Sequence, residues 1–322
     1  MTGSERMAVS GLIRKKASEL GFNLCGIAQC RPLEECRPVL EEWLNAGMND
    51  KMGYLARNVQ KRLDPGLLLQ GAKSIVVTGM NYFSENRQKH PGVPVISRYA
   101  YGIDYHEILI PCLEELLSFV KNLVPETEGK TFCDSGPILE KAWAIEAGLG
   151  WQGRHSVLIN REIGSFFFIG ILVLNIELEY DKPHSENFCG DCRLCIDSCP
   201  TGAINENHTI DARKCIANLT IENKGPIRED LLPFLGGRVY GCDKCQEVCP
   251  WNNCARQNTN REMMLPDEIA DMSVEEWQGL TAERFEMLFG RSAIGRVKYE
   301  NFRRNINAAI GSGKPIRPSS AN

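Results

Sequence analysis

The sequence predicts an α+β protein with three parts: a mixed helix-and-strand domain, a small cysteine-rich domain and a helical C-terminal segment. Three observations predict this order. Helical and strand-like apolar patterns alternate through roughly the first 180 residues. Eight of the fourteen cysteines fall between residues 189 and 249, and the rest of the chain shows short helical patterns. We therefore expect domains at residues 1–180, 181–255 and 256–322.

Composition and charge indicate an ordinary globular protein. The chain has 322 residues, a formal net charge of −4, 43% hydrophobic and 24% charged residues. Such a charge disfavours nucleic-acid binding over the whole surface but allows a local basic patch. The longest apolar run, residues 166–174, is too short to span a bilayer, and no signal peptide pattern opens the chain. We expect a cytoplasmic protein that does not enter a membrane.

Alternating patterns define the elements of the first domain. A valine, leucine and alanine stripe at helical spacing ends at Gly21, where a helix is expected to stop. β-branched residues dominate the run from Ser74 to Tyr82, which is typical of a central strand. In order, we expect helix 8–20, strand 22–28, helix 43–55, a turn and short helix over 61–71, strand 74–82, helix 109–124 with Pro111 in its first turn, and strands 156–160 and 165–175.

Asp134 stands out in the segment that follows the long helix. Pro137 suits the first position of a helix whose buried stripe runs to Leu149. Asp134 would then lie just ahead of a helix N-terminus, either as a cap or as a carboxyl presented at a cleft. Glycines follow at positions 150, 153, 164 and 170, where they would form turns or let a large flat ligand approach the backbone.

The cysteine spacing predicts two iron–sulfur clusters. The first run has the C-x-x-C-x-x-C-x-x-x-C-P spacing of bacterial two-cluster ferredoxins, in which the last cysteine binds the other cluster. By that crossed arrangement, one [4Fe–4S] cluster takes Cys189, Cys192, Cys195 and Cys249, and the other takes Cys199, Cys215, Cys242 and Cys245. The alternative is a pair of structural zinc sites, which normally show two separated C-x-x-C pairs. Two clusters indicate single-electron transfer.

The C-terminal region carries a basic stretch with interleaved aromatic residues. Tyr299 and Phe302 alternate with basic side chains, and Glu300 is the acid among them. This pattern is either an ordinary solvated face or a surface that contacts nucleic-acid phosphates. Its basic members are Arg291, Arg296, Lys298, Arg303 and Arg304.

The chain resembles the epoxyqueuosine reductases, cobalamin-dependent iron–sulfur enzymes that complete queuosine in the anticodon of certain tRNAs. The motifs that carry the resemblance extend from about residue 50 to about residue 310: MGYLARNVQKRLDP, SRYAYGIDYH, DSGPILEKAWAIEAGLGWQG, GSFFFIGILVL, CGDCRLCIDSCPTGAI, CIANLTIENKG, GCDKCQEVCPWN and GRSAIGR. The family more often has a lysine where this chain has Arg154.

The resemblance implies a function and a site. The first domain would bind cobalamin, and Asp134 would be the proton donor. An oxidoreductase acting on CH or CH2 groups would remove the epoxide oxygen at the tRNA wobble position, with electrons from an external donor and the protein a monomer. The implied cobalamin contacts are Arg57, Ser97, Asp134, His155, Leu158 and Gly170.

Two other functions compete with this interpretation. A two-cluster electron carrier without catalysis would not need the long segment before the cysteines. A corrinoid-dependent reductive dehalogenase would keep both cofactors and change the substrate, but the basic C-terminal region and the missing export signal disfavour it.

Overall fold

A four-stranded antiparallel sheet forms the centre of the first domain in the computed structural model, which describes residues 1–311. Its strand order is β1 (Leu24–Gln29), β2 (Ser74–Asn81), β7 (Phe167–Leu174) and β4 (Gly129–Phe132). All eight residues of β2 are buried. Val76 packs into one apolar cluster, while its neighbours Ile75 and Val77 pack into another, so both faces of the sheet are covered.

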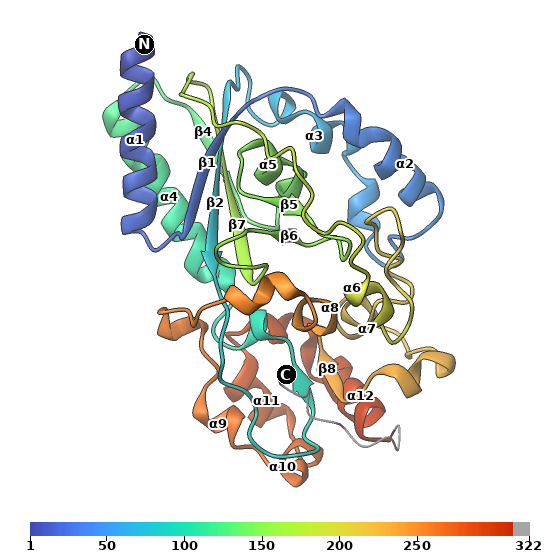
Figure 1. Ribbon diagram of the computed structural model, residues 1–322. Coiled ribbons are helices and arrows are strands. Elements are labelled where there is room, and N and C mark those ends of the chain that lie inside the picture. Colours follow the sequence, from blue (N-terminus) through green and yellow to red (C-terminus); the bar gives the residue numbers. More distant parts are fainter. Residues whose placement is uncertain (312–322) are drawn as a thin grey trace.

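Helices cover the two faces of this sheet (Figure 1). On one face, α1 (Gly3–Glu19) packs against α4 (Tyr105–Leu123). On the other face lies α5 (Glu140–Glu146), which contacts β1, β2 and β7. The remaining elements of this part are α2 (Arg37–Asn45), α3 (Val59–Leu63), the short strands β3 (Val95–Ile96), β5 (Trp151–Gln152) and β6 (Leu158–Ile159), and single 3-10 turns at Glu34–Cys36, Gly53–Ala56, Pro65–Leu67 and Arg98–Ala100.

The cysteine-rich region contains little regular structure. Its helices are α6 (Leu194–Asp197), α7 (Ile216–Ile221) and α8 (Lys244–Glu247), and its one strand, β8 (Arg238–Tyr240), pairs in parallel with β3 from the first domain. Two 3-10 turns, Glu229–Phe234 and Pro250–Cys254, complete it. The pairing of β3 with β8 fixes this region to the sheet domain.

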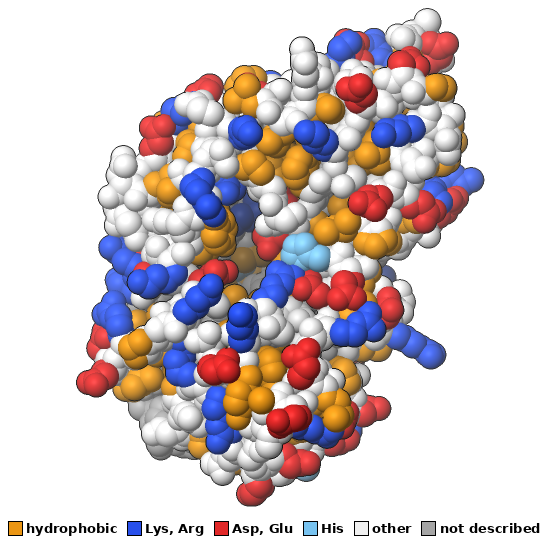
Figure 2. All heavy atoms as spheres, turned by 180° about the vertical axis from the view of Figure 1, so that it is seen from behind, with side chains coloured by type: hydrophobic (Ala, Val, Ile, Leu, Met, Phe, Trp, Pro, Cys, Tyr) orange, Lys and Arg blue, Asp and Glu red, His pale blue; other side chains and the backbone are white. Residues whose placement is uncertain are grey.

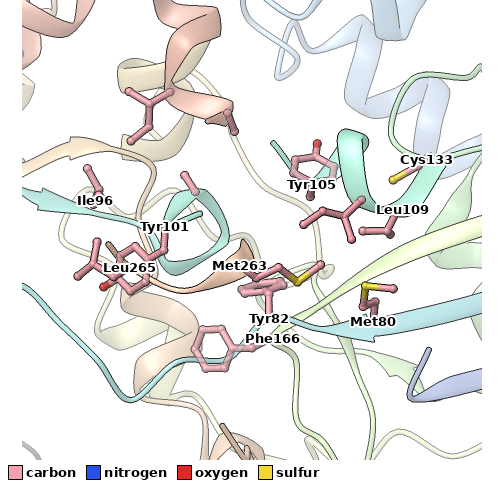
Figure 3. Packing of buried hydrophobic residues seen from close by; sticks show 14 of the residues in the cluster. Met80, Tyr82, Ile96, Tyr101, Tyr105, Leu109, Cys133, Phe166, Met263 and Leu265 are labelled. Carbon is pink, nitrogen blue, oxygen red and sulfur yellow. The ribbon is translucent and has the colours of Figure 1, made fainter. Parts of the chain in front are cut away.

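The C-terminal segment is helical, as predicted. It holds α9 (Asp267–Ala270), α10 (Val274–Gln278), α11 (Ala282–Phe289) and α12 (Lys298–Gly311), with 3-10 turns at Arg261–Met263 and Ala293–Val297. Trp277, Phe289 and Phe302 are fully buried there. Met263 and Leu265 belong to the same apolar cluster as residues of the sheet domain (Figure 3). The core therefore extends across the proposed domain boundaries.

All the helices predicted for the first domain begin or end elsewhere. The helix expected at 8–20 starts earlier, at Gly3, and the short helix expected over 61–71 is α3 (Val59–Leu63) followed by a 3-10 turn. The helix expected at 43–55 is instead α2, which ends at Asn45, followed by a separate 3-10 turn at Gly53–Ala56. Pro111 lies inside α4 because that helix begins earlier, at Tyr105, with Asp104 as its cap. The helix expected from Pro137 starts at Glu140, since residues 133–138 form a bend. No helix among residues 1–311 is both long and apolar enough to cross a membrane.

Candidate functional site

The eight cysteines of the two predicted sets form two adjacent groups. Cys189, Cys192 and Cys195 line one cavity of about 240 Å³ together with Cys249, which comes from the other run. In the second group, burial and then neighbouring thiols of the same group raise the pKa of Cys245, and Cys195 of the first group contributes as well. Burial and, to a smaller extent, the neighbouring thiol of Cys199 raise the pKa of Cys215, and burial and Cys215 raise that of Cys242. The thiols of each predicted ligand set therefore lie near one another, and their ligation of clusters stays a prediction.

The short helices α6 and α8 produce this crossing. They pack against each other, and each comes just before the Cys-Pro end of its run, so each final cysteine lies beside the opposite group. Within residues 1–311, no three acidic, histidine or cysteine side chains converge on a position for a single metal ion. The thiols of the first group instead line a cavity.

Backbone N–H groups point at these sulfurs. The amide of Ala203 donates to Cys199 Sγ at 3.3 Å. Burial raises the pKa values of Cys195 and Cys249, while the amides of Ile196 and Trp251 oppose that rise. Thiolates around a cavity with amides directed at sulfur fit the environment that a [4Fe–4S] cluster needs. The residues present therefore fit two such clusters.

A second site centres on Asp134. Its side chain is exposed, and its backbone has a positive φ of 56° in the bend between β4 and α5. The Tyr105 hydroxyl donates to Asp134 Oδ2 at 2.7 Å, and the Asp134 amide donates to Glu140 Oε1 at 2.5 Å. Asp134 does not cap α5, because the cap position is Leu139 and has no side-chain hydrogen bond. The prediction of Asp134 just ahead of a helix N-terminus is wrong, whereas a carboxyl presented outward agrees with its exposure.

Carboxyl and phenol groups from both halves of the chain surround Asp134. Burial and then the charge of Asp134 raise the pKa of Glu140 to about 8. The same two causes raise the pKa of Glu222, which follows α7 in the cysteine-rich region. They also raise the pKa of Tyr105. Asp134 thus lies where the two regions face each other, and Figure 2 shows a hollow between the upper and lower parts of one face of the molecule.

The ion pair between Arg296 and Asp104 lies beside Tyr105. The Arg296 guanidinium lies 5.3 Å from the centre of the Tyr105 ring, and its Nε donates to Asp104 Oδ2 at 2.7 Å. Burial alone would raise the pKa of Asp104, but hydrogen bonds from His106 and Arg296 lower it well below its usual value. Asp104 also caps α4 through the amide of His106. This network fixes the start of α4 and therefore the position of Tyr105.

The other predicted cobalamin contacts lie in different surroundings. Arg57 is exposed, directly after the turn that carries Tyr54. Ser97 is 3% exposed, and its side chain lies against Gly241 in the second cysteine group's loop. His155 is 3% exposed and lines the cavity of the first cysteine group, where burial and then Lys141 lower its pKa to about 4.

The last two predicted contacts have packing roles. Leu158 is buried in β6 within the apolar cluster that also contains Trp143. A methyl group on Gly170 would lie 2.7 Å from Thr78 Oγ1 and 2.8 Å from a methyl of Leu113. Close packing of α4 on the sheet thus accounts for this glycine.

Sequence reasoning missed Tyr105, Glu140 and Glu222 as members of the Asp134 site. The density of aromatic and ionisable residues around Tyr105 was the available signal. Glu140 and Glu222 carried no such signal, because their position beside Asp134 depends on the bend and on the docking of the cysteine-rich region.

The fold and the two sites define a class: a redox protein with two iron–sulfur clusters and an exposed carboxyl, Asp134, where the sheet domain meets the cysteine-rich region. Comparison with known proteins identifies the family. The sequence model for "Epoxyqueuosine reductase QueG, DUF1730" matches residues 62–135, and that for a 4Fe-4S double cluster binding domain matches residues 188–252.

Similar proteins agree with these matches. The chain is 44% identical over 297 residues to the epoxyqueuosine reductase of Cyclobacterium marinum, covering 92% of this chain and 95% of the relative. It is 39% identical to the Escherichia coli enzyme over 93% of this chain and 80% of that one. The crystal structure of the Streptococcus thermophilus enzyme matches with a TM-score of 0.86 and 27% identity, covering 95% and 82%. The chain belongs to the epoxyqueuosine reductase family.

Proposed function

We propose that the protein reductively removes the epoxide oxygen of epoxyqueuosine at the wobble position of tRNA, giving queuosine. Membership of the epoxyqueuosine reductase family at 44% identity over nearly the full length is the observation that carries this proposal. Converting an epoxide to an alkene consumes two electrons and two protons and releases the oxygen as water. The two clusters held by the cysteine groups would supply a route for the electrons, and the Asp134 site would supply a proton.

Asp134 is the proposed proton donor to the oxygen as it gains negative charge. Asp134 is exposed, and the Tyr105 hydroxyl donates to its Oδ2 at 2.7 Å. Glu140, with a pKa of about 8, holds its own proton near neutral pH and accepts from the Asp134 amide. A structure of the Bacillus subtilis enzyme, described with its aspartate catalytic loop swung out of the active site, supports a mobile acid on such a bend.

Cobalamin is the proposed resident cofactor, and it would supply a low-valent cobalt able to break a carbon–oxygen bond. The surroundings of Asp134 offer groups that fit a large ligand with polar side arms. Tyr54 is 41% exposed there, and burial and then Glu222 and Asp134 raise its pKa to about 12. Arg57 and Lys141 are exposed cations on nearby segments. We propose Tyr54, Arg57 and Lys141 as residues that hold it.

The proposed polymeric substrate is the anticodon stem-loop of a tRNA. A relative of this chain has been crystallised with an epoxyqueuosine-modified tRNA-Tyr stem loop, and it matches with a TM-score of 0.86. The modified base must leave the anticodon stack to reach an acid in a hollow. Lys224 and Lys298 are exposed cations suited to hold the backbone, whereas Arg303 and Arg304 donate to backbone carbonyls of the protein itself. These intramolecular hydrogen bonds give no support to the prediction that Arg303 and Arg304 bind the tRNA backbone.

Electrons would come from an external one-electron donor, since each cluster carries one electron at a time. The protein is proposed to act as a monomer. The substrate would place the protein in the cytoplasm. A reconstituted sample that elutes at the monomer mass and accepts electrons from a flavodoxin or ferredoxin would agree.

The direct test is an anaerobic assay. Protein reconstituted with iron, sulfide and cobalamin is incubated with a chemical reductant and tRNA containing epoxyqueuosine, and the nucleosides are separated by mass. We expect queuosine to replace epoxyqueuosine, and we expect none when cobalamin or reductant is omitted. Full iron and cobalamin content with no queuosine would overturn the proposal.

A further inference from the structure

A tight turn presents Arg154 and His155 to the first cysteine group. The turn joins β5 to β6: the Gly153 amide donates to Val157 O at 2.9 Å, and the Ser156 amide donates to Gly153 O at 2.9 Å. Lys141 Nζ holds the turn from α5 by donating to Ser156 O at 2.6 Å. Arg154 and His155 both line the cavity around Cys189, Cys192, Cys195 and Cys249. Their positions are therefore set by backbone structure.

His155 carries an unused donor. Its Nδ1 accepts the Val157 amide at 3.2 Å, so the ring hydrogen lies on Nε2 in the neutral form, and Nε2 bears a hydrogen in the charged form as well. The side chain is 3% exposed, and Nε2 is buried with no partner among residues 1–311. A buried donor without an acceptor costs about 1–3 kcal/mol. An acceptor for Nε2 is therefore expected within the cavity.

Arg154 carries a second unused donor at the same place. Its Nη2 donates to Gly190 O at 2.8 Å, in the loop of the first cysteine run, and its Nη1 lies 3.3 Å from Glu206 Oε2. These contacts fix the guanidinium, yet Nε is buried without a partner in the described chain. Two N–H groups on consecutive residues thus need acceptors beside one cavity.

The cavity walls offer one kind of side-chain acceptor. Apart from Arg154 and His155, the lining consists of four cysteines and apolar side chains: Phe188, Leu194, Pro250 and Trp251. Among these lining residues, the side-chain acceptors are the cysteine sulfurs. Sulfur atoms of the cysteines, or of the cluster that they hold, are the partners that both donors would reach.

We propose that Arg154 Nε and His155 Nε2 donate hydrogen bonds to sulfur atoms of the cluster held by Cys189, Cys192, Cys195 and Cys249, which makes it the more easily reduced of the two clusters. The inference rests on the proposed cluster content. Reduction adds one negative charge to a cluster, and donors directed at its sulfurs stabilise that charge. Beside the second group, Arg98 pairs with Asp243 at 3.6 Å, so these charges largely cancel, and Arg238 contributes one positive charge near Cys242.

A redox titration of the reconstituted protein, followed by electron paramagnetic resonance, tests this inference. His155→Phe removes one donor, and Arg154→Lys keeps the charge but removes Nε–H. Arg193→Lys is the matched control, because Arg193 also pairs with Glu206 but does not line the cavity. We expect each of the first two variants to lower the midpoint of one cluster only. The reduced-to-oxidised ratio of that cluster at fixed potential should fall about three- to tenfold, where tenfold corresponds to about 59 mV.

The outcomes separate this inference from the proposed function. A parent protein without iron would contradict the cluster assignment itself. Full iron content with unshifted midpoints, or equal shifts of both clusters, would overturn the hydrogen-bond inference alone. If His155→Phe loses the cluster, His155→Gln distinguishes a donor role from a structural one. Recovery of the iron content and the midpoint potential in His155→Gln, whose amide can donate, supports the inference. Equal loss of iron in both variants makes His155 a purely structural residue.

Discussion

The sheet domain and the cysteine-rich region are held together by different forces. All of β2 is buried, and apolar side chains cover both faces of the sheet. Between residues 188 and 252 the helices α6 and α8 have four residues each, and the thiols face a cavity. Apolar burial therefore fixes the platform of Asp134, while bound clusters are expected to order the cysteine-rich region, because metal binding and folding are coupled. Substitutions in the cysteine-rich region should therefore change the iron content, whereas substitutions elsewhere should change the free energy of unfolding or the turnover.

The largest effect is expected from Cys199→Ser. Crossed ligation places Cys199 with Cys215, Cys242 and Cys245, although it belongs to the first run. The reconstituted parent should hold about eight irons, and the variant about half of that, with loss of turnover. Iron and sulfide analysis measures this. Cys254→Ser is the control, since that thiol donates to Trp251 O and is not a predicted ligand. Full iron in Cys199→Ser would refute the role of Cys199 as a cluster ligand.

A smaller effect is expected at the joint between the two regions. Arg304 on α12 donates to Asn223 O at 2.7 Å and to Gly225 O, so it ties the C-terminal helix to the cysteine-rich region. Arg304→Met should lower the free energy of unfolding by about 2 kcal/mol, because charged donors are lost. Anaerobic urea unfolding measures this, with exposed Lys298→Met as the control.

The same pair of variants separates stability from tRNA binding. We expect Lys298→Met to weaken tRNA binding and to flatten its salt dependence while leaving stability unchanged. If Arg304→Met kept its stability but bound tRNA more weakly, Arg304 would contact tRNA as the sequence predicted.

The smallest expected effect concerns Glu140 and pH. Its folded-state pKa of about 8 lies above the usual value of 4.5. As pH rises from about 4.5 to about 8, the unfolded chain loses this proton while the folded protein keeps it, so folding loses stability across that window. The full shift would change the stability difference between parent and Glu140→Gln by about 3 kcal/mol from pH 5 to pH 8. Because Glu140 is only partly buried, solvent screening reduces the expected relative gain of Glu140→Gln to on the order of 1 kcal/mol. Urea midpoints at both pH values measure it, and a constant difference between the two proteins would contradict the raised pKa.

Three strands of the sheet and the cysteine groups were predictable because their signals are local, whereas the fourth strand, β4, was not expected. A β-branched run marks β2, and fixed spacing between cysteines marks the ligand sets. The start of α5 was not predictable, because it depends on a hydrogen bond from the Asp134 amide, in the bend before the helix, to the Glu140 carboxylate. Arg304 was read as a surface cation, since its carbonyl partners lie about 80 positions away in the chain. Contacts between distant segments leave no periodic pattern.

One comparison tests the central claim that the sheet domain supplies the acid and the cysteine-rich region supplies the electrons. Asp134→Asn and the parent are reconstituted to equal iron and cobalamin content, and queuosine formed on tRNA is measured under excess reductant. Asn can still accept from Tyr105, so the site keeps its shape but lacks an acidic proton. We predict at least about a hundredfold loss of turnover with tRNA affinity and cluster potentials unchanged. Equal turnover of the two proteins would contradict the account.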